Sequence, residues 1–308
     1  MLVKTTHYEF ALTSMLLIVF RLPTPVKMRG MATGPLVDPH FFIIMDRLYE
    51  TLAERMPHWR RTFFHARGGF LGLGANRPVL HNLLLERMVV AYDIAAAFTY
   101  MHDHKLIYRD IKKENFGFDV RGDIKVFDFG LAKSANASLR AKDKDGKDLY
   151  GYHLTPRTGT IPFMAPEVAM CEPYDEKCDV YSFAILLWEI ISLRLAFPGL
   201  NRRNYVENIV ERKQRLPIGR GKMWPPLTRM LLKDAWDPEP QKRPDMRRVS
   251  TILRGDLNDL STDSRIRNRT QHMKNRSAHS MRGERMNQYR EDSPPVSPPP
   301  KSKHGAAM

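Results

Sequence analysis

The spacing of apolar residues along the chain predicts a long core helix, a short buried strand before it and a hairpin after it. Over Leu83–His104 apolar residues recur every three or four positions, the period of a helix with one buried face. Phe41–Met45 is a short apolar run, typical of a buried strand, and it leads into an amphipathic helix over Tyr49–Met56. Over Phe116–Phe127 apolar and polar residues alternate around a turn at Arg121–Asp123, which predicts two antiparallel strands.

The most apolar segment, Phe10–Phe20, is too short to cross a membrane. A spanning helix needs about 20 apolar residues, and Arg21 and Pro23 follow this run directly. Lys4 precedes it, as a basic residue does in a signal peptide, but no small-x-small cleavage site comes after it. The pattern therefore predicts no membrane span and disfavours secretion.

Four polar residues flank the predicted hairpin and suggest its chemistry. Asp110, Lys112 and Asn115 precede the hairpin, and Asp128 follows it. Because a hairpin returns its two ends to one place, Asn115 and Asp128 are expected to face one cleft. Phosphoryl transfer from ATP needs these residue types. One carboxylate orients the attacking hydroxyl, a cation steadies the phosphoryl group, and an amide oxygen and a second carboxylate hold magnesium.

The segment that contains these residues resembles part of a known family. Residues 108–130 read YRDIKKENFGFDVRGDIKVFDFG, similar to the catalytic loop, hairpin and metal-binding motif of the eukaryotic protein kinases. Three later motifs resemble the same family: Ala165-Pro166-Glu167, DVYSFAILLWEI over Asp179–Ile190, and Lys242-Arg243-Pro244, whose Arg243 is expected to pair with Glu167. The resemblance implies an α+β, protein kinase-like fold with a mostly helical large lobe and an incomplete small lobe.

The resemblance also assigns roles to the four polar residues. Asp110 would be the catalytic base, Lys112 would contact the transferring phosphate, and Asn115 and Asp128 would hold Mg²⁺. Serine/threonine kinases resemble this chain in having a Lys at the position of Lys112. The sequence around Thr160 resembles that of their tyrosine-kinase-like branch. The implied function is transfer of the ATP γ-phosphate to Ser or Thr hydroxyls of a protein substrate.

The connection after the predicted strand resembles the hinge between kinase lobes. Backbone groups of Met45, Asp46 and Leu48 would bind the adenine of ATP, and Met45 would gate the pocket behind it. An ordinary strand-to-helix joint is the alternative. Gly117 stands where the family has an aliphatic side chain under the adenine, which would forgo about 1–3 kcal/mol of contact unless a neighbour fills the gap.

Regulation is expected in the segment Leu131–Met164, which resembles a kinase activation segment. Its AKDKDGKD stretch is highly charged and is expected to be mobile. Arg109 could pair with a phosphate on Thr155 or Thr158 and so order the segment, although an unmodified loop is an equal alternative. Thr160 resembles the Thr that hydrogen-bonds the catalytic Asp and Lys in the family.

The chain departs from the family before the hinge. No G-x-G-x-x-G-x-V motif and no Ala-x-Lys strand precede it, and GGFLGLG over Gly68–Gly74 lacks the spacing of a phosphate loop. Glu9 is a candidate for the Glu of the small-lobe helix, although a plain buried helix would look the same. We therefore expect an N-terminally truncated serine/threonine kinase, weak or inactive alone. A pseudokinase or scaffold that binds partners without catalysis is the alternative.

Composition divides the chain into residues 1–40, a remnant of the small lobe; 41–260, the kinase domain with hinge and large lobe; and 261–308, a Pro-rich tail expected to be disordered. The net charge is +15, and the tail holds ten Lys and Arg against four Asp and Glu. Tail contact with nucleic acid or acidic lipid has weak support, because only Tyr289 accompanies the arginines. Two cysteines suit a reducing compartment, and a cytoplasmic location is the default expectation. The basic tail makes a nuclear location the alternative.

Overall fold

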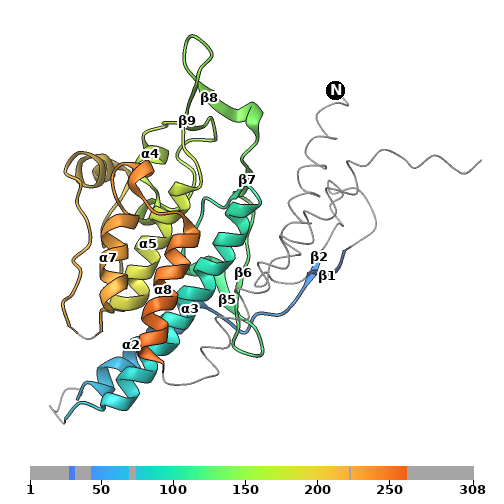
Figure 1. The fold of residues 1–308 in the computed structure, drawn as a ribbon. Helices are drawn as coiled ribbons and strands as arrows, with labels where there is room; N and C mark the ends of the chain where they lie inside the picture. Colours follow the sequence, from blue (N-terminus) through green and yellow to red (C-terminus); the bar gives the residue numbers. More distant parts are fainter. Residues whose placement is uncertain (1–27, 32–42, 69–73, 222, 262–308) are drawn as a thin grey trace, which may run out of the picture. The chain divides into compact units, whose positions relative to one another are not determined.

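The computed structural model describes residues 28–31, 43–68, 74–221 and 223–261, which all belong to one compact unit. Helices dominate the described residues, with short strands between them (Figure 1). The longest helices are α2 (Leu52–Ala66), α3 (Arg77–Asp103), α5 (Lys177–Ser192), α7 (Pro226–Ala235) and α8 (Met246–Leu260). This mixture of helix and sheet is the fold class that the sequence predicts.

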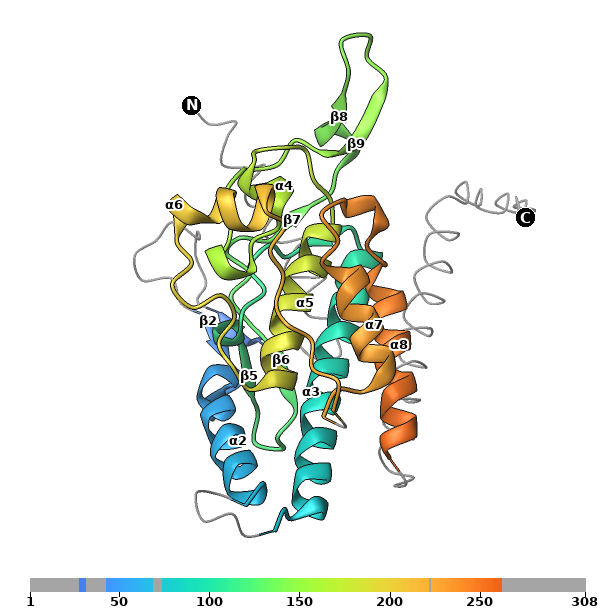
Figure 2. The same ribbon diagram turned by 90° about the vertical axis from the view of Figure 1, so that its left-hand side faces the viewer.

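Helix α3 is the centre of the helical core. It packs against α2, α5 and α8, and α7 contacts both α5 and α8. Figure 2 shows α3, α5, α7 and α8 side by side. The apolar residues that predicted α3 face this core, and Ile94, Phe98 and Met101 are completely buried. The helix begins at Arg77, earlier than predicted, because Asn76 caps it by accepting from the Val79 amide at 3.2 Å.

A buried arginine fastens α3 to α5. Arg87 donates through NH1 to the backbone oxygens of Ile190 and Ile191, at 3.1 and 3.0 Å, and through Nε to Leu83. Carbonyls in the last turn of a helix lack partners within the helix, so Arg87 satisfies the end of α5. Burial lowers the pKa of the Arg87 guanidinium to about 10.

The prediction for α2 was wrong in its extent. A helix over Tyr49–Met56 followed by irregular chain was expected, but α2 begins at Leu52 and continues through Pro57 to Ala66. Thr51 and Glu54 form a capping box that fixes the start. Pro57 removes one backbone donor, at a cost of about 3 kcal/mol. Packing against α3 offsets that cost, because Trp59 is buried and donates to Glu86 at 3.0 Å.

A three-stranded sheet carries the predicted hairpin. Its order is β3 (Glu50–Thr51), β5 (Phe116–Phe118) and β6 (Ile124–Val126), all antiparallel, with Gly117 opposite both Thr51 and Lys125. Asp119 closes the β5–β6 turn by accepting from the Arg121 and Asp123 amides. The hairpin predicted from alternation is therefore present, with its turn where the sequence placed it.

The remaining elements are short. The other paired strands are β1 (Met28–Met31) with β2 (Ile43–Met45), β4 (Leu106–Ile107) with β7 (Lys133–Ser134), and β8 (Arg140–Lys142) with β9 (Asp148–Tyr152). Single turns of 3-10 helix are η1 (Lys113–Asn115), η2 (Ala137–Leu139), η3 (Ile161–Phe163) and η5 (Pro240–Lys242). Short helices are α4 (Pro166–Ala169), α6 (Arg202–Tyr205) and the π-helical turn η4 (Val206–Glu211).

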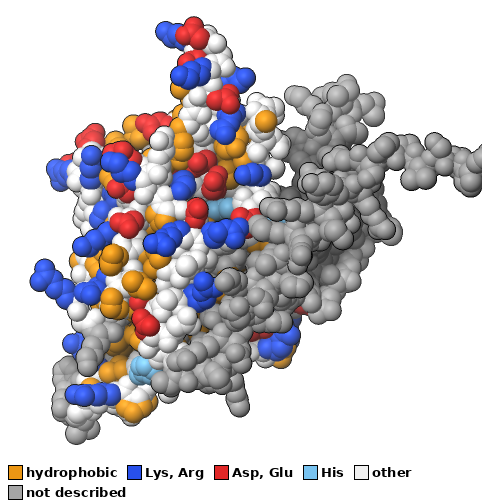
Figure 3. Space-filling model, viewed as in Figure 1, with side chains coloured by type: hydrophobic (Ala, Val, Ile, Leu, Met, Phe, Trp, Pro, Cys, Tyr) orange, Lys and Arg blue, Asp and Glu red, His pale blue; other side chains and the backbone are white. Residues whose placement is uncertain are grey.

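The charged stretch of the activation segment forms a hairpin that was not predicted, and its expected mobility stays a prediction. AKDKDGKD forms the tip of the β8–β9 hairpin and was expected to be mobile. Asp143 accepts from the Asp145 and Lys147 amides, and Gly146 takes a positive φ of 78°. Asp-Gly is a strong hairpin signal, and the high charge concealed it. In Figure 3 this hairpin carries both acidic and basic side chains.

Two predictions fall mainly outside the described residues. Glu9 and most of the expected remnant at residues 1–40 lie there, with only β1 described, and so does the tail after Ser261. Within the described ranges, no helix combines the length and apolarity needed to cross a bilayer.

Candidate active site

The β5–β6 hairpin brings two of the predicted site residues together at its open end. Asn115 ends the turn η1 immediately before β5, and Asp128 follows β6 by two positions. The backbone amide of Phe127 donates to the backbone oxygen of Asn115 at 3.2 Å, so the two chain segments are hydrogen-bonded at this point. The structure therefore places Asn115 and Asp128 at one end of the hairpin.

Asp110 is the centre of a polar cluster. Its Oδ2 accepts from Lys112 Nζ at 2.6 Å and from Asn115 Nδ2 at 3.0 Å. Its Oδ1 accepts from Thr160 Oγ1 at 2.9 Å. The Asp110 carboxylate is buried, and three donors from two segments of the chain fix its orientation. A carboxylate held in this way can receive a proton from a hydroxyl placed beside it.

Asp179 positions the backbone that carries Asp110. This residue is completely buried in the first turn of α5. Its Oδ2 accepts from the Tyr108 amide at 2.8 Å and its Oδ1 from the Arg109 amide at 2.7 Å, while His102 Nε2 lies 2.9 Å from Oδ2. Arg109 has φ of 70°, which residues other than glycine rarely adopt. The two backbone hydrogen bonds that Asp179 accepts hold this strained conformation next to Asp110.

Asp128 is exposed, and its backbone, like that of Arg109, has a left-handed conformation, with φ of 58°. Its Oδ1 accepts from the Gly130 amide at 3.3 Å. Nearby, Tyr108 donates to the Phe127 oxygen at 2.5 Å. Burial raises the pKa of the Tyr108 phenol well above its usual value, and the charges of Asp110 and Asp128 add to this effect. The charges of both carboxylates therefore act on one buried phenol.

The oxygen atoms of this cluster suit a magnesium ion. Magnesium prefers oxygen ligands, and proteins usually hold it through one or two carboxylates together with water and substrate phosphates. Asn115 uses Nδ2 to donate to Asp110, which leaves its Oδ1 as the ligand atom. The described residues contain no cluster of three or more His, Cys, Asp and Glu side chains of the kind that holds a metal alone. Asn115 and Asp128 would supply two oxygen ligands to such an ion, with water and substrate phosphates as the others.

The residues predicted to form the hinge lie at the end of β2 and in the connection to β3. Met45 ends β2 and pairs with Met28, and Asp46 and Leu48 lie in the connection to β3. The gap foreseen at Gly117 is filled, because the side chain of Leu48 lies directly against it. The adenine contacts expected from Met45, Asp46 and Leu48 stay predictions.

Arg109 connects the catalytic loop with the activation segment. Its Nε donates to the Leu131 oxygen at 2.7 Å, and its NH1 donates to the Tyr174 hydroxyl at 3.0 Å. The Tyr174 hydroxyl in turn donates to the backbone oxygen of Thr155 at 2.7 Å, and Thr158 Oγ1 donates to the same backbone oxygen at 2.8 Å. The guanidinium thus reaches the segment of both candidate phosphosites through Tyr174. Phosphorylation of either Thr stays a prediction.

Sequence reasoning missed two residues of this region. Tyr174 lies far along the chain from Arg109, and no local pattern announces the contact. Gly159 precedes Thr160 with φ of 102°, and a Cβ there would lie 2.5 Å from the Arg109 oxygen. The Gly-Thr pair in the sequence is the signal that could have identified this close approach.

Glu167 and Arg243 form a buried ion pair. Arg243 donates to both carboxylate oxygens of Glu167, at 2.7 and 2.8 Å, and each side chain is almost completely buried. Burial lowers the pKa of Arg243, but the Glu167 carboxylate outweighs this effect and the net shift is upward. The pair joins the end of the activation segment to the turn before α8.

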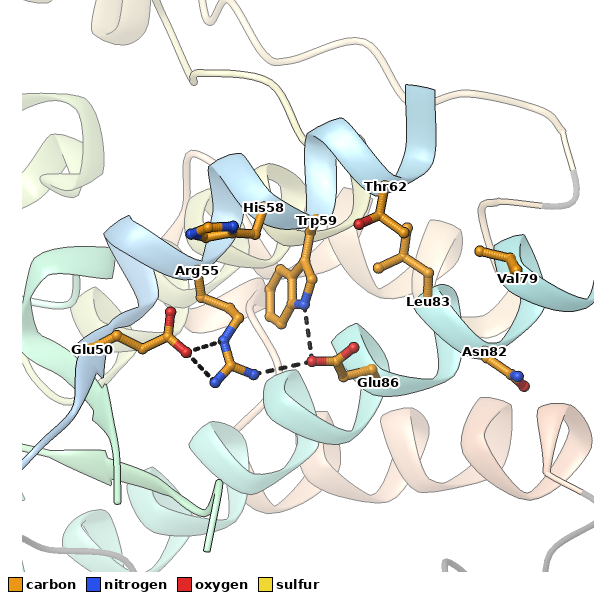
Figure 4. Close-up of a pocket in the computed structure, with 9 residues that line it drawn as sticks. All are labelled: Glu50, Arg55, His58, Trp59, Thr62, Val79, Asn82, Leu83 and Glu86. Atoms are coloured by element: carbon orange, nitrogen blue, oxygen red, sulfur yellow. Dashed lines mark hydrogen bonds and ion pairs between the residues drawn. The ribbon is translucent and has the colours of Figure 1, made fainter. Parts of the chain in front are cut away.

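A separate cavity of about 560 Å³ lies between α2 and α3 (Figure 4). Arg55 bridges Glu50 and Glu86 at its base, and Trp59 donates to Glu86. None of Asp110, Lys112, Asn115 and Asp128 lines this cavity. Its charged groups pair with one another, so we assign it no part in the chemistry.

The comparisons with known proteins agree with the geometry. Residues 81–252 match the family described as "Protein kinase domain". The chain is 33% identical over 172 residues to the serine/threonine-protein kinase CTR1 of Arabidopsis thaliana, covering 55% of this chain and 19% of that protein. It is 30% identical over 177 residues to mitogen-activated protein kinase kinase kinase 12 of Rattus norvegicus, covering 58% and 18%. It is 30% identical over 186 residues to the serine/threonine/tyrosine-protein kinase HT1 of Arabidopsis thaliana, covering 60% and 44%. The matched region thus spans less than half of each of these relatives.

Proposed function

Because this chain belongs to the protein kinase family, we propose that it transfers the γ-phosphate of ATP to Ser or Thr hydroxyls of a protein substrate. One observation carries the proposal. Lys112, Asn115 and Thr160 converge on the carboxylate of Asp110, and the exposed Asp128 lies at the same end of the hairpin as Asn115. A scaffold that binds partners without catalysis has no need of this arrangement.

Each side chain then has a defined task. Asp110 orients the attacking hydroxyl and accepts its proton. Lys112 lies 2.6 Å from Asp110 and places a positive charge where the phosphoryl group passes. Asn115 and Asp128 hold magnesium, which neutralises the charge of the phosphates when it is bound. Thr160 keeps the activation segment against Asp110, so that the substrate hydroxyl is held next to the base.

The preference for Ser and Thr is supported by Lys112 and by the names of the relatives. CTR1 of Arabidopsis thaliana is a serine/threonine-protein kinase by name, and HT1 is named for tyrosine as well. The tyrosine-kinase-like branch remains the group whose motifs this chain resembles. Phosphate on Ser and Thr is therefore the expected product.

A cavity lined by residues on either side of Thr160 supports a peptide substrate. It has a volume of about 210 Å³ and includes Ile161, the residue after Thr160. Its remaining lining residues are Arg157, Met164, Ala169, Arg202, Tyr205 and Val206. We assign it to a substrate residue close to the phosphorylated hydroxyl, because Thr160 joins its wall to Asp110.

The experiment is a phosphoryl-transfer assay with Mg²⁺, labelled ATP and a mixture of Ser, Thr and Tyr peptides. Transfer is expected to be weak, because the sequence contains no Gly-rich strand pair and no Ala-x-Lys strand to hold the α- and β-phosphates. Asp110→Asn should lower the rate of transfer about 100-fold or more, while circular dichroism shows that the protein stays folded. Transfer that Asp110→Asn leaves unchanged would contradict the proposal. Nucleotide binding with no transfer at all would favour the scaffold.

Two further aspects are proposals on sequence grounds alone. We place the protein in the cytoplasm or nucleus, since two cysteines suit a reducing compartment. Contact of the basic tail with nucleic acid or acidic lipid has weaker support. On the described surface in Figure 3, acidic and basic side chains are interspersed, whereas nucleic-acid binding is usually marked by a patch of one sign.

A further inference from the structure

Two neighbouring lysines of the catalytic loop contact two different carboxylates. Lys112 pairs with Asp110, whereas Lys113 Nζ donates to Glu189 Oε2 at 2.8 Å. The backbone of Lys112 is extended, with φ of −156° and ψ of 157°, and successive side chains of an extended chain point to opposite sides. Lys113 is therefore directed to the other side of the loop from Lys112 and takes no direct part in the proposed chemistry.

The partner of Lys113 is a carboxylate in the buried helix α5. The side chain of Glu189 is only 1% exposed, and that of Lys113 is 18% exposed. Glu189 Oε1 accepts from the backbone amide of Ala196 at 2.7 Å, so each of its two oxygens has a donor. An ionised carboxylate at this depth needs such partners, because burying an unpaired charge is very unfavourable. Lys113 thus supplies the positive charge that lets Glu189 lie inside the lobe.

The ion pair fixes the start of the turn that carries Asn115. Lys113 is the first residue of η1, and Asn115 is the last. A 3-10 turn rises about 2 Å per residue, so the two residues lie about 4 Å apart along its axis. Asn115 donates to Asp110 and is proposed to hold magnesium. The position of η1 against α5 therefore determines where Asn115 lies.

Lys113 also lies close to the activation segment. Its Nζ is 6.0 Å from the centre of the Phe163 ring, at the outer limit of a cation–π contact. Phe163 ends the turn η3, which directly follows Thr160, the donor to the proposed base. Ser182, which like Glu189 belongs to α5, donates to the backbone oxygen of Phe163 at 2.7 Å. Helix α5 thus holds both η1 and η3, and Lys113 contacts residues of α5 and of η3.

We propose that Lys113 is a positioning residue for phosphoryl transfer. Its ion pair with Glu189 sets the position of η1, and hence of Asn115 relative to Asp110 and to a bound magnesium ion. The inference rests on the proposed kinase function, because that function gives Asn115 its task. Residues that orient a metal ligand usually change metal affinity or activity about 10- to 100-fold when they are substituted. Loss of the pair should therefore affect catalysis and the response to Mg²⁺, and not stability alone.

The competing explanation is that the pair only stabilises the fold. Lys113→Met alone does not separate the two explanations, because it leaves Glu189 buried and unpaired and destabilises the protein in either case. The double variant Lys113→Met with Glu189→Gln does separate them. Gln carries no charge, and its side-chain oxygen can still accept from the Ala196 amide. If the pair is only structural, stability and activity should recover together. If Lys113 positions Asn115, stability should recover and activity should not.

The experiment uses the full 308-residue chain and three measurements. These are urea unfolding, phosphoryl transfer at saturating ATP, and calorimetric titration of ATP with and without Mg²⁺. The double variant should keep an unfolding midpoint close to that of the unmodified chain. Its kcat should be about tenfold lower, and the strengthening of ATP binding by Mg²⁺ should be about threefold smaller or less than that of the unmodified chain. The Mg²⁺ effect on binding decides the question even where transfer is weak.

Two further variants serve as controls. Lys113→Arg keeps a positive charge opposite Glu189 and should retain both kcat and the Mg²⁺ effect. Lys242→Met is the matched control, because it breaks a Lys–Glu pair of 2.7 Å in which both side chains are exposed. It should change none of the three measurements.

Two results would overturn the inference alone. One is a double variant that recovers kcat and the Mg²⁺ effect together with stability. The other is an Lys113→Met protein in which only the unfolding midpoint changes. An unmodified chain that transfers no phosphate and binds ATP equally with and without Mg²⁺ would instead overturn the proposed function, and this inference with it.

Discussion

Thr160 Oγ1 donates to Asp110 Oδ1 at 2.9 Å, and this bond joins the activation segment to the catalytic loop. The other carboxylate oxygen of Asp110 is engaged by Lys112 and Asn115. Control of the activation segment is therefore also control of the orientation of the proposed base.

Thr160→Val should reduce phosphoryl transfer while the protein stays folded. The change keeps the shape of the side chain but leaves Asp110 Oδ1 without its donor. A hydrogen bond to a charged group contributes about 1.5–3 kcal/mol, so kcat should fall about 10- to 100-fold. Thr160→Ser keeps the hydroxyl and is the matched control. Equal rates for the Val and Ser variants would show that the bond has no part in catalysis.

Arg243→Ala should destabilise the protein strongly, because it leaves the Glu167 carboxylate buried without a partner. Breaking such a pair costs about 3–5 kcal/mol, which urea unfolding can measure. The neighbouring Lys242 pairs with Glu239 at the surface, where both side chains are exposed. Lys242→Ala should therefore leave the unfolding midpoint unchanged, and a similar loss in both variants would contradict this account of the buried pair.

Asp175 should make stability depend on pH. Burial raises the pKa of its carboxyl above the ordinary 3.8, although the Tyr150 hydroxyl donates to it at 2.6 Å. A raised pKa means that the folded state holds the proton more tightly than the unfolded state does. The contribution of the Asp175 carboxyl to the free energy of unfolding is thus fully present below about pH 4. It is lost as the pH rises through the pKa of this carboxyl in the folded state.

Asp175→Asn should remove that loss, since Asn accepts the same hydrogen bond from Tyr150 without charge. Urea unfolding of both proteins between pH 4 and pH 8 measures the difference. The variant should gain stability relative to the unmodified chain as the pH rises. A difference that stays constant over the range would contradict the assigned direction.

Arg157 and Arg202 should favour substrates with an acidic residue near the phosphorylated hydroxyl. Both line the cavity beside Thr160, and within the described part of the chain neither has an ion-pair partner. Peptides with Glu next to the target Ser should show a lower KM than matched peptides with Lys. The charge reversal Arg157→Glu with Arg202→Glu should invert this order, and an unchanged order would remove the cavity from substrate selection.

The sequence was most informative where a pattern is local. Alternation over Phe116–Phe127 identified the hairpin, and its geometry follows from a turn that Asp119 closes with its own side chain. The same hairpin explains why Asn115 and Asp128 could be expected together. The pairing of Arg243 with Glu167 came from the family resemblance, since nothing local links residues so far apart in the chain.

Other features depend on packing that no local pattern contains. Helix α2 continues through Pro57 because Trp59 packs against α3 and donates to Glu86. The contact of Leu48 with Gly117 depends on the register of β3 against β5, which sequence alone leaves undetermined. The β8–β9 hairpin at the AKDKDGKD stretch was missed for a different reason, because its Asp-Gly turn signal was present and its charge was given more weight.

Magnesium-dependent nucleotide binding tests the central claim most directly. The measurement is calorimetric titration of the 308-residue chain with ATP, with and without Mg²⁺, alongside Asp128→Asn. Asn tolerates the left-handed conformation of Asp128, so the backbone should be kept while the carboxylate charge is lost. We predict that Mg²⁺ strengthens ATP binding at least tenfold in the unmodified chain and does not do so in Asp128→Asn. Binding that ignores Mg²⁺, or an equal Mg²⁺ effect in both proteins, would contradict the account.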